Sequence, residues 1–232
     1  MDTDACVITP PARALLSVAR TSQKFPVRRI YCVGRNYVAH VREMGGDEAR
    51  DPPIFFQKPA DSIVLDGSSI PYPPMTRNYH YELELVVALK EGGRDIPVAE
   101  ALDHIYGYGI GLDMTRRDLQ MELGKSGLPW EAGKAFDHSC PCGQIYPVEQ
   151  VGHIQEGSIR LTVDGETRQD SDLSLMIWKV PEIIANLSKY FMLQAGDIIL
   201  TGTPAGVGPV VPGNELVGSI DRLGTLRVQI SN

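Results

Sequence analysis

Residues 80–89, HYELELVVAL, are the stretch from which the rest of the chain can be placed. Successive residues of a β-strand point to opposite faces of the sheet. One face of this strand is apolar along its whole length and consists of Tyr81, Leu83, Leu85, Val87 and Leu89. The other face starts polar and becomes apolar, in the order His80, Glu82, Glu84, Val86 and Ala88. The sequence therefore predicts a strand that is buried on both sides and carries two neighbouring carboxylates on one of them.

Two buried carboxylates at this spacing repel each other or share a proton unless a cation neutralises them. Glu82 and Glu84 therefore favour a site for Mg²⁺ or Mn²⁺, hard ions that bind carboxylate oxygens. Asp113 is a candidate third ligand because it ends the predicted strand YGIGLD, residues 108–113. The alternatives are an edge strand whose solvent face carries two acids, and a turn aspartate that bonds the local backbone.

His40 and Glu43 form a candidate acid–base pair. They lie three residues apart on a helix predicted for residues 37–44, so their side chains share one face. A carboxylate beside an imidazole selects its tautomer and raises its basicity, as a general base near neutral pH requires. A surface ion pair is the alternative interpretation of the same spacing.

Two further stretches carry candidate binding groups. Lys134 lies in the largely apolar segment WEAGKAFD (130–137), where an ammonium group could stabilise a developing oxyanion; the alternative is a solvated lysine. The glycine-rich stretch TGTPAGVGP (201–209) offers backbone N–H groups and the hydroxyls of Thr201 and Thr203 to a carboxylate. It lacks the Gly-Lys-Ser/Thr ending of a phosphate-binding loop, and a tight turn is its alternative interpretation.

Composition narrows the classes of protein. The 232 residues carry a net charge of −7, which argues against nucleic acid or an anionic membrane surface as a partner. No apolar run is long enough to span a membrane, and the first twenty residues begin acidic and contain Pro10-Pro11, unlike a signal peptide. We expect a cytoplasmic protein whose four cysteines are reduced and mostly structural, because Cys140-Pro-Cys142 lacks the spacing of a zinc or redox pair.

The remaining pattern predicts one β-rich α+β domain that is preceded, in residues 1–26, by an extended arm or a small lead-in element. Further strands are expected at 28–34, 54–56 and 62–64, with an Asp-Gly hairpin in 158–170. Residues 196–208 and the closing residues 216–231 are expected to complete a β-rich C-terminal half. Helices are expected at 37–44, with Asn36 as N-cap and Gly45-Gly46 as its end, at 98–107, at 115–123 and at 181–190. Thr115 and Asp118 fit a capping box for the third of these, which leaves Asp113 without a capping role.

Six motifs in this order resemble the fumarylacetoacetate hydrolase family: GRNYVAHVREMG, KPADSIV, HYELELVVAL, GLDMTRRDLQ, WEAGKAFDHSCP and TGTPAGVG. The resemblance covers residues 27–232, which it identifies as a catalytic domain. The segments FPVRRIYCVGRNYVAHVREMG and DPPIFFQKPAD are most similar to the bacterial branch of the family that hydrolyses fumarylpyruvate in aromatic breakdown. The resemblance implies a mixed β-roll with a few short helices, dependence on Mg²⁺ or Mn²⁺, and a homodimer.

The resemblance also implies roles for individual residues. The implied metal ligands are Glu82, Glu84 and Asp113, and the implied water-activating pair is His40 and Glu43. Lys134 is expected to stabilise the oxyanion, and the other implied substrate contacts are Arg117, Gln120 and Thr203. Longer family members add an aspartate ligand ahead of the histidine. This chain has no acid there, so the ion is expected to keep more water or substrate ligands.

The implied activity is metal-dependent hydrolysis of a carbon–carbon bond in an acylpyruvate, with fumarylpyruvate giving fumarate and pyruvate. Decarboxylation of a 2-oxoacid such as oxaloacetate and isomerisation of an unsaturated diacid are alternatives within the family. A metal-dependent phosphohydrolase and a non-catalytic, metal-stabilised binding module are alternatives outside it. A diacid substrate needs a cation for its distal carboxylate, and the sequence leaves four equal candidates: Arg35, Arg42, Arg116 and Lys125.

Overall fold

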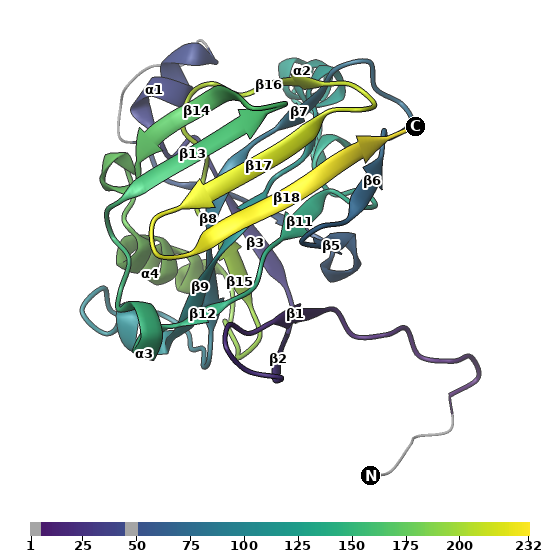
Figure 1. Ribbon diagram of the computed structural model, residues 1–232. Coiled ribbons are helices and arrows are strands. Elements are labelled where there is room, and N and C mark those ends of the chain that lie inside the picture. Colours follow the sequence, from purple (N-terminus) through teal and green to yellow (C-terminus); the bar gives the residue numbers. More distant parts are fainter. Residues whose placement is uncertain (1–5, 45–50) are drawn as a thin grey trace.

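The computed structural model describes residues 6–44 and 51–232, and two curved β-sheets stacked on each other form most of the protein (Figure 1). Within these residues the larger sheet has the order β4 (Ile54–Lys58), β3 (Ile30–Gly34), β15 (Ile198–Leu200), β8 (Leu83–Leu89), β9 (Ile105–Leu112), β11 (Cys140–Cys142) and β5 (Ile63–Leu65), with β12 (Tyr146–Pro147) paired to β9. The pairs β15–β3 and β11–β5 are parallel and the others antiparallel, so this sheet is mixed, as the fold prediction requires.

The second sheet has the order β14 (Glu166–Asp172), β13 (Ser158–Val163), β17 (Glu215–Ile220), β18 (Gly224–Ser231) and β6 (Ser69–Pro71). Its hairpin β13–β14 turns at Asp164-Gly165, where both residues have positive φ, and this confirms the predicted Asp-Gly turn. A short sheet of β10 (Thr115–Arg116), β7 (Tyr79–Tyr81) and β16 (Gly208–Val210) adjoins the site described below.

The strand predicted at 80–89 forms in two pieces, β7 and β8, which are separated at Glu82. Leu83, Leu85 and Val87 pack into the core between the two sheets. Val86 and Ala88 pack into a second core on the opposite face of the larger sheet. The predicted alternation and the burial of both faces are therefore confirmed.

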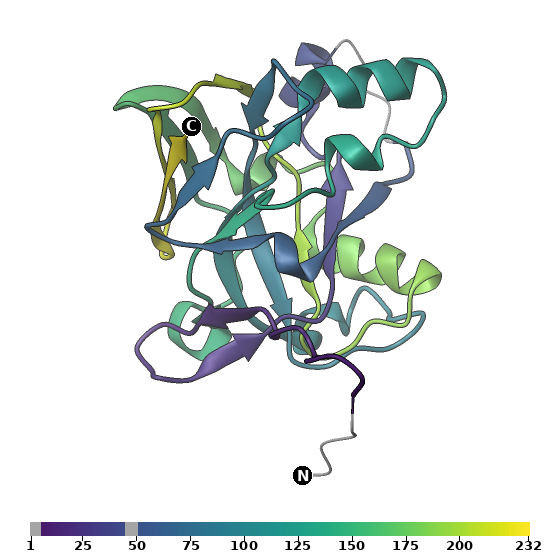
Figure 2. The same cartoon turned by 90° about the vertical axis from the view of Figure 1, so that its right-hand side faces the viewer.

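The second core is covered by a hairpin of β1 (Leu15–Ser17) and β2 (Lys24–Pro26), which contributes Leu16 and Phe25. Figure 2 shows this hairpin below the larger sheet, with the five-stranded sheet on the left and helices α2 (Arg117–Lys125) and α4 (Val180–Tyr190) on the right. Cys32, Cys140 and Cys142 lie in this second core, and no cysteine of the described chain is in a disulfide.

The helices are short and lie at the edges of the sheets. They are α1 (Val38–Glu43), α2, α3 (Val148–Val151) and α4, with single 3₁₀ turns at Ala60–Ser62, Ala101–His104, Glu131–Gly133 and Leu173–Leu175. The helices predicted at 37–44 and 181–190 are confirmed; Gly45-Gly46, predicted to end the first, lie outside the described residues. No helix in the described part of the chain is both long and apolar enough to cross a membrane.

The helix predicted at 98–107 is wrong. Only Ala101–His104 form a 3₁₀ turn, and strand β9 begins at Ile105, opposite Leu89 of β8. Gly107 explains part of the difference, because a Cβ there would lie 2.3 Å from the carbonyl oxygen of Tyr146 on the neighbouring strand. Pairing with two strands outweighs a short apolar spacing that is compatible with either structure.

Both predicted helix caps are also wrong. Tyr37, not Asn36, occupies the N-cap of α1, and the side chain of Asn36 instead bonds backbone groups of Trp178 and Thr201. Thr115 lies in β10, and its hydroxyl donates to the carbonyl oxygen of Asp113. Thr115 is therefore not the predicted cap of α2, whereas the predicted position of Asp113 at a strand end is correct.

Candidate active site

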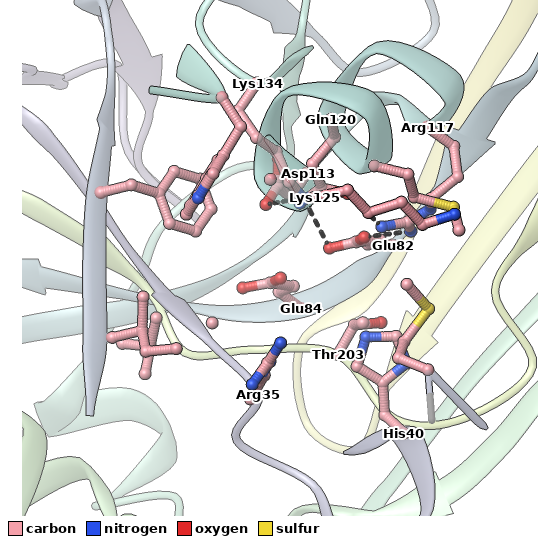
Figure 3. A pocket seen from close by; sticks show the side chains of 18 residues that line it. Arg35, His40, Glu82, Glu84, Asp113, Arg117, Gln120, Lys125, Lys134 and Thr203 are labelled. Atoms are coloured by element: carbon pink, nitrogen blue, oxygen red, sulfur yellow. Dashed lines mark hydrogen bonds and ion pairs between the residues drawn. The ribbon is translucent and has the colours of Figure 1, made fainter. Parts of the chain in front are cut away.

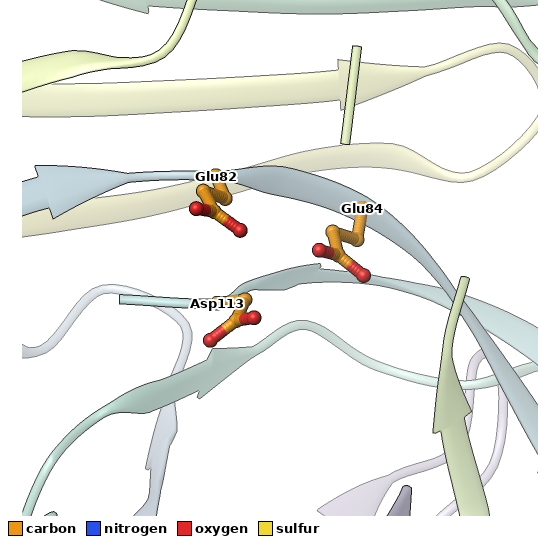
Figure 4. Close-up of side chains that lie close together, drawn as sticks. All are labelled: Glu82, Glu84 and Asp113. Atoms are coloured by element: carbon orange, nitrogen blue, oxygen red, sulfur yellow. The ribbon is translucent and has the colours of Figure 1, made fainter. Parts of the chain in front are cut away.

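Three buried carboxylates meet where β8 and β9 emerge from the larger sheet (Figure 4). Glu82 and Glu84 flank the start of β8, and Asp113 directly follows β9. One oxygen of each carboxylate lies within 4.8 Å of the others, and the three residues are 5%, 1% and 1% exposed. The antiparallel pairing of Leu83 with Leu112 produces this convergence of residues that are about thirty positions apart in the chain.

Three buried cations surround the cluster. The Nζ atom of Lys134 lies 2.8 Å from Glu82 Oε2 and 2.7 Å from Asp113 Oδ2. A guanidinium nitrogen of Arg117 forms an ion pair with Glu82 Oε1. The Nζ atom of Lys58 lies 2.9 Å from Asp113 Oδ1 and also donates to the backbone carbonyls of Met114 and Lys134. Glu82 and Asp113 are therefore neutralised by protein groups, whereas Glu84 is not.

Because Glu82 has cationic partners and Glu84 has none among residues 6–44 and 51–232, the pKa values of the two glutamates shift in opposite directions. Burial raises the pKa of Glu84 well above its ordinary value, and the negative charges of Asp113 and Glu82 raise it further. Burial also opposes ionisation of Glu82, but Lys134 and Arg117 outweigh it and hold the pKa of Glu82 below its ordinary value. The carboxylate of Glu84 accepts one short hydrogen bond at Oε2, 2.6 Å from the backbone N of Gly202.

The donor set fits a hard divalent cation. All three candidate ligands offer carboxylate oxygens, which are the donors that Mg²⁺ and Mn²⁺ prefer. Oδ1 of Asp113 is buried and accepts no hydrogen bond, since Lys58 lies within ion-pair distance of it but out of hydrogen-bond alignment. A buried oxygen without a donor is costly, and an ion would supply the missing interaction.

His40 and Glu43 lie on α1, and their side chains meet as predicted. The Nδ1 atom of His40 is 3.1 Å from Oε2 of Glu43, while Oε1 of Glu43 accepts a 3.0 Å bond from the backbone N of Gly206. A carboxylate can only accept, so an ionised Glu43 places the proton of a neutral His40 on Nδ1 and leaves Nε2 as the basic nitrogen. His40 is buried, and Glu43 is one-third exposed.

A pocket of about 440 Å³ opens above the carboxylates (Figure 3), a size that suits a small-molecule ligand. Eight of the nine candidate site residues line it: His40, Glu82, Glu84, Asp113, Arg117, Gln120, Lys134 and Thr203. Glu43 does not line it and reaches it only through His40. The side walls include Ile54, Phe56, Met121 and Trp130, so the pocket has a charged floor and partly apolar walls.

The side chains predicted to contact the substrate form hydrogen bonds with other protein groups. Arg117 donates to Gln120 Oε1 at 2.6 Å in addition to its ion pair with Glu82. The hydroxyl of Thr203 accepts a 2.8 Å bond from Gln169, whereas Thr201 donates to the carbonyl of Leu85 and does not line the pocket. The glycine-rich loop does bind carboxylates through its backbone, as considered from the sequence, but they are those of Glu43 and Glu84.

Lys58 is a site residue that the sequence did not predict. The lysine of the motif KPADSIV is not among the residues expected at the site, yet in the structure Lys58 ends β4 and is 3% exposed. A lysine two positions after the apolar run Ile-Phe-Phe, at the end of a strand, was the available signal. Gly202 was likewise missed as a donor to Glu84: its φ of +95° favours glycine, and a Cβ there would lie 2.6 Å from Asn36 Cβ.

The structure divides the four candidate cations for a distal carboxylate into two that line the pocket and two that do not. Arg35 and Lys125 line the pocket, and Arg42 and Arg116 do not. The guanidinium of Arg116 stacks 4.2 Å from the ring centroid of Phe136 and donates to the carbonyl of Ala132.

Comparison with known proteins extends over nearly the whole chain. The family model described as Fumarylacetoacetate (FAA) hydrolase C-terminal matches residues 29–231. The crystal structure of a fumarylpyruvate hydrolase from Pseudomonas aeruginosa in complex with Mn²⁺ and pyruvate is 52% identical, with a TM-score of 0.96 over 97% of this chain and 99% of that one.

Two curated relatives carry different activities in their names. The oxaloacetate tautomerase FAHD1, mitochondrial, of Pongo abelii is 44% identical over 88% of this chain and 91% of its own length. A fumarylpyruvate hydrolase from Ralstonia sp is 42% identical over 79% of this chain and 95% of its own length. Sequence similarity alone therefore does not separate a hydrolase from a tautomerase.

Proposed function

This chain belongs to the fumarylacetoacetate hydrolase family, and on that premise we propose that it is a metal-dependent hydrolase of acylpyruvates, with fumarylpyruvate as its favoured substrate. The observation that carries the proposal is the buried cluster of Glu82, Glu84 and Asp113 on the floor of a pocket that His40 also lines. The related Pseudomonas aeruginosa enzyme, whose crystal structure contains Mn²⁺ and pyruvate, supports it, because pyruvate is a product of the proposed reaction.

In this proposal Glu82, Glu84 and Asp113 hold Mg²⁺ or Mn²⁺. When bound, the ion would supply a Lewis acid and a template for the 1-carboxylate and 2-oxo group of the substrate. Arg117 and Gln120, joined by a 2.6 Å bond, position the same end of the substrate, and Thr203 lies on another side of the pocket (Figure 3).

His40 is the proposed general base. Its Nε2 removes a proton from water as the water oxygen bonds to C4 of the acylpyruvate, and Glu43 stabilises the resulting imidazolium through Nδ1. The contact between Glu43 and the backbone N of Gly206 fixes the carboxylate and hence the orientation of the ring.

Lys134 is the proposed donor to the oxyanion that forms on C4. Its ammonium group has three N–H bonds, of which Glu82 and Asp113 take two, so one remains for a substrate oxygen. When the C4 carbonyl forms again, the C3–C4 bond breaks and its electron pair passes to C3 as the enolate of pyruvate. The proton held by His40 then returns to C3, which releases pyruvate and the second acid.

Enolisation of a 2-oxo diacid is the second candidate, and the 44% identity to the oxaloacetate tautomerase favours it specifically. It requires the same groups on the floor of the pocket and a proton transfer at C3, but no attack by water. The two reactions differ in their products, because a tautomerase breaks no carbon–carbon bond.

The test is incubation of the purified protein with fumarylpyruvate and Mg²⁺ or Mn²⁺, with and without a chelator. We expect loss of the enol absorbance together with equal amounts of fumarate and pyruvate, and no reaction with the chelator. Accelerated enol–keto exchange of oxaloacetate without release of pyruvate from any acylpyruvate would instead establish the tautomerase. Binding of the ion with no turnover of either substrate would leave a non-catalytic binding module.

We further propose that residues 27–232 form the catalytic domain, with residues 1–26 as a lead-in element, and that the protein is a homodimer. The extent of the family match, residues 29–231, supports the division, and the packing of the β1–β2 hairpin against the larger sheet supports the assignment of residues 1–26 as a lead-in element. Light scattering of the purified chain tests the oligomeric state, and removal of residues 1–26 followed by a thermal melt tests whether the domain needs its lead-in element.

A further inference from the structure

Besides the buried, paired cations around the carboxylates, the pocket contains two solvent-exposed cations. Lys134 and Arg117 are committed to the acids of the cluster. Arg35 and Lys125 also line the pocket but are exposed to solvent, and within residues 6–44 and 51–232 neither has an ion pair or a side-chain hydrogen bond. They are therefore available to an anionic group that enters the pocket.

The backbone of Arg35 is held in an uncommon conformation. Its φ is +58°, in the left-handed region that residues other than glycine, asparagine and aspartate seldom adopt. The next residue, Asn36, is buried and anchors this turn: its amide donates to the carbonyls of Thr201 (2.7 Å) and Trp178 (3.0 Å) and accepts from the backbone N of Trp178 (2.7 Å). Strained residues of this kind persist where the surrounding structure enforces them, and they cluster at ligand sites.

The direction of the side chain gives this conformation a use. In Figure 3 the guanidinium group of Arg35 points from the end of β3 toward the carboxylate cluster, and Lys125 lies on the other side of that cluster, on helix α2. A substrate whose 2-oxo acid end lies at the carboxylate cluster extends between the pocket walls. Its far end then comes close to Arg35 and Lys125.

We propose that Arg35 binds the distal carboxylate of the substrate and so makes the site selective for 2-oxo diacids over 2-oxo monoacids. The inference rests on the proposed function, because that function places the 2-oxo acid end at Glu82, Glu84 and Asp113. A guanidinium group presents a planar pair of N–H donors that matches a carboxylate, and a rigid backbone reduces the entropy lost on binding.

The other candidate cations have structural explanations. Arg116 stacks on Phe136 away from the pocket, and Arg42 does not line the pocket and has another interaction in the protein. Lys125 is in the last turn of α2, where a positive charge stabilises the carboxyl end of a helix without any ligand. Arg35 alone combines pocket exposure with a backbone conformation that needs a reason.

The test compares kcat/KM for fumarylpyruvate, a diacid, with that for acetylpyruvate, a monoacid, at saturating Mn²⁺. The variant is Arg35→Asn, because asparagine tolerates a left-handed backbone and removes the charge. We expect the diacid-to-monoacid ratio to fall by about ten- to a hundredfold, the range for loss of a charge-assisted hydrogen bond, mainly through KM. Arg35→Lys should recover part of the ratio.

Lys125→Gln is the matched control, because it removes the same charge from the same pocket. It should keep the diacid-to-monoacid ratio within about threefold of that of the unmodified protein, as expected for an exposed charge. An unchanged ratio in Arg35→Asn, or a larger loss of the ratio in Lys125→Gln, would overturn the proposal. Thermal melts of each variant show that the compared proteins are folded.

A binding measurement separates this inference from the proposed reaction. Calorimetry with Mn²⁺ compares 2-oxopimelate with 2-oxoheptanoate, which have the same chain length and differ in the distal carboxylate. Tighter binding of the diacid that disappears in Arg35→Asn supports the inference even if no acylpyruvate is hydrolysed, in which case the proposed function fails alone. Hydrolysis combined with equal binding of the two acids would overturn the inference and leave the function intact.

Discussion

The Nζ atom of Lys134 lies 2.7 Å from Oδ2 of Asp113, and both residues are almost completely buried. The same nitrogen is 2.8 Å from Oε2 of Glu82, so one ammonium group bridges two of the three carboxylates proposed to hold a metal ion. Asp113 and Glu82 together keep the pKa of Lys134 above its ordinary value, although burial alone would lower it. A divalent cation held by the same carboxylates would therefore lie close to the ammonium group and be repelled by its charge.

Replacing Lys134 with methionine is expected to tighten Mn²⁺ binding by about tenfold or more, because it removes a positive charge adjacent to the ion. The metal-free variant should be about 3 kcal/mol less stable to urea, because two buried carboxylates lose their partner. Isothermal calorimetry and urea titrations measure the two effects. Lys125→Met, which removes an exposed charge, should change neither quantity by as much. Weaker Mn²⁺ binding by Lys134→Met would contradict the repulsion between the ammonium group and the ion.

Replacing His40 with alanine is expected to lower kcat for an acylpyruvate by about a hundred- to ten-thousandfold, the usual contribution of a general base. Its affinity for Mn²⁺ should change little, because His40 faces the pocket from α1 and is not one of the clustered acids. Glu82→Ala is the contrasting variant and should lose both turnover and the ion. Full turnover by His40→Ala would rule out its role as the base.

The ionisation of Asp118 is expected to make the free energy of unfolding depend on pH. Its carboxylate accepts bonds from Thr76 Oγ1 (2.5 Å) and from the backbone N of Arg77 and of Leu119 (both 2.9 Å). Although desolvation opposes them, these bonds hold the pKa of Asp118 below its ordinary value. The stabilisation is therefore present above the unfolded-state pKa and is lost as the pH falls through the lower folded-state pKa.

The corresponding variant is Asp118→Asn, measured by urea unfolding at several pH values. At pH 7 it should be about 1 kcal/mol less stable than the unmodified protein, a small figure because the carboxylate is largely solvated. The difference should shrink as the pH falls through the folded-state pKa of Asp118, below which the acid is protonated in both states. A difference that stays constant over this range would show that the charge of Asp118 does not act through these bonds.

Lys58 is expected to be structural as well as electrostatic. Lys58→Met removes the donor of two buried backbone carbonyls and the ion-pair partner of Asp113, which should cost about 3 kcal/mol of unfolding free energy. Lys90→Met is the control, since Lys90 is exposed and its replacement should stay within about 0.5 kcal/mol. Equal stabilities of the two variants would show that the buried contacts of Lys58 contribute nothing net.

Much of the fold followed from local spacing. The alternation of residues 80–89 predicted which side chains enter which core, the Asp-Gly pair predicted the hairpin β13–β14, and the apolar spacing after Pro181 predicted α4. Each of these patterns depends on backbone geometry over a few residues, which neighbours in the chain determine.

The errors share another cause. Residues 98–107 have a spacing compatible with a helix or a strand, and the presence of β8 beside Ile105 selected the strand. Asn36 and Thr115 are suitable capping residues that found other partners, on Trp178, Thr201 and Asp113. A polar side chain bonds whichever backbone group packing brings near it, and that group can be over a hundred positions away.

For the site, the sequence by itself determined that Glu82 and Glu84 share a face and that His40 and Glu43 are one helical turn apart, because both relations are periods of regular structure. Only the tertiary structure decided that Lys58 reaches Asp113, that Lys134 bridges two acids, and that Arg35 rather than Arg116 faces the pocket. The partner of a charged side chain depends on distances across the pocket. Those distances are set by the packing of strands that lie far apart in the chain, which no local pattern records.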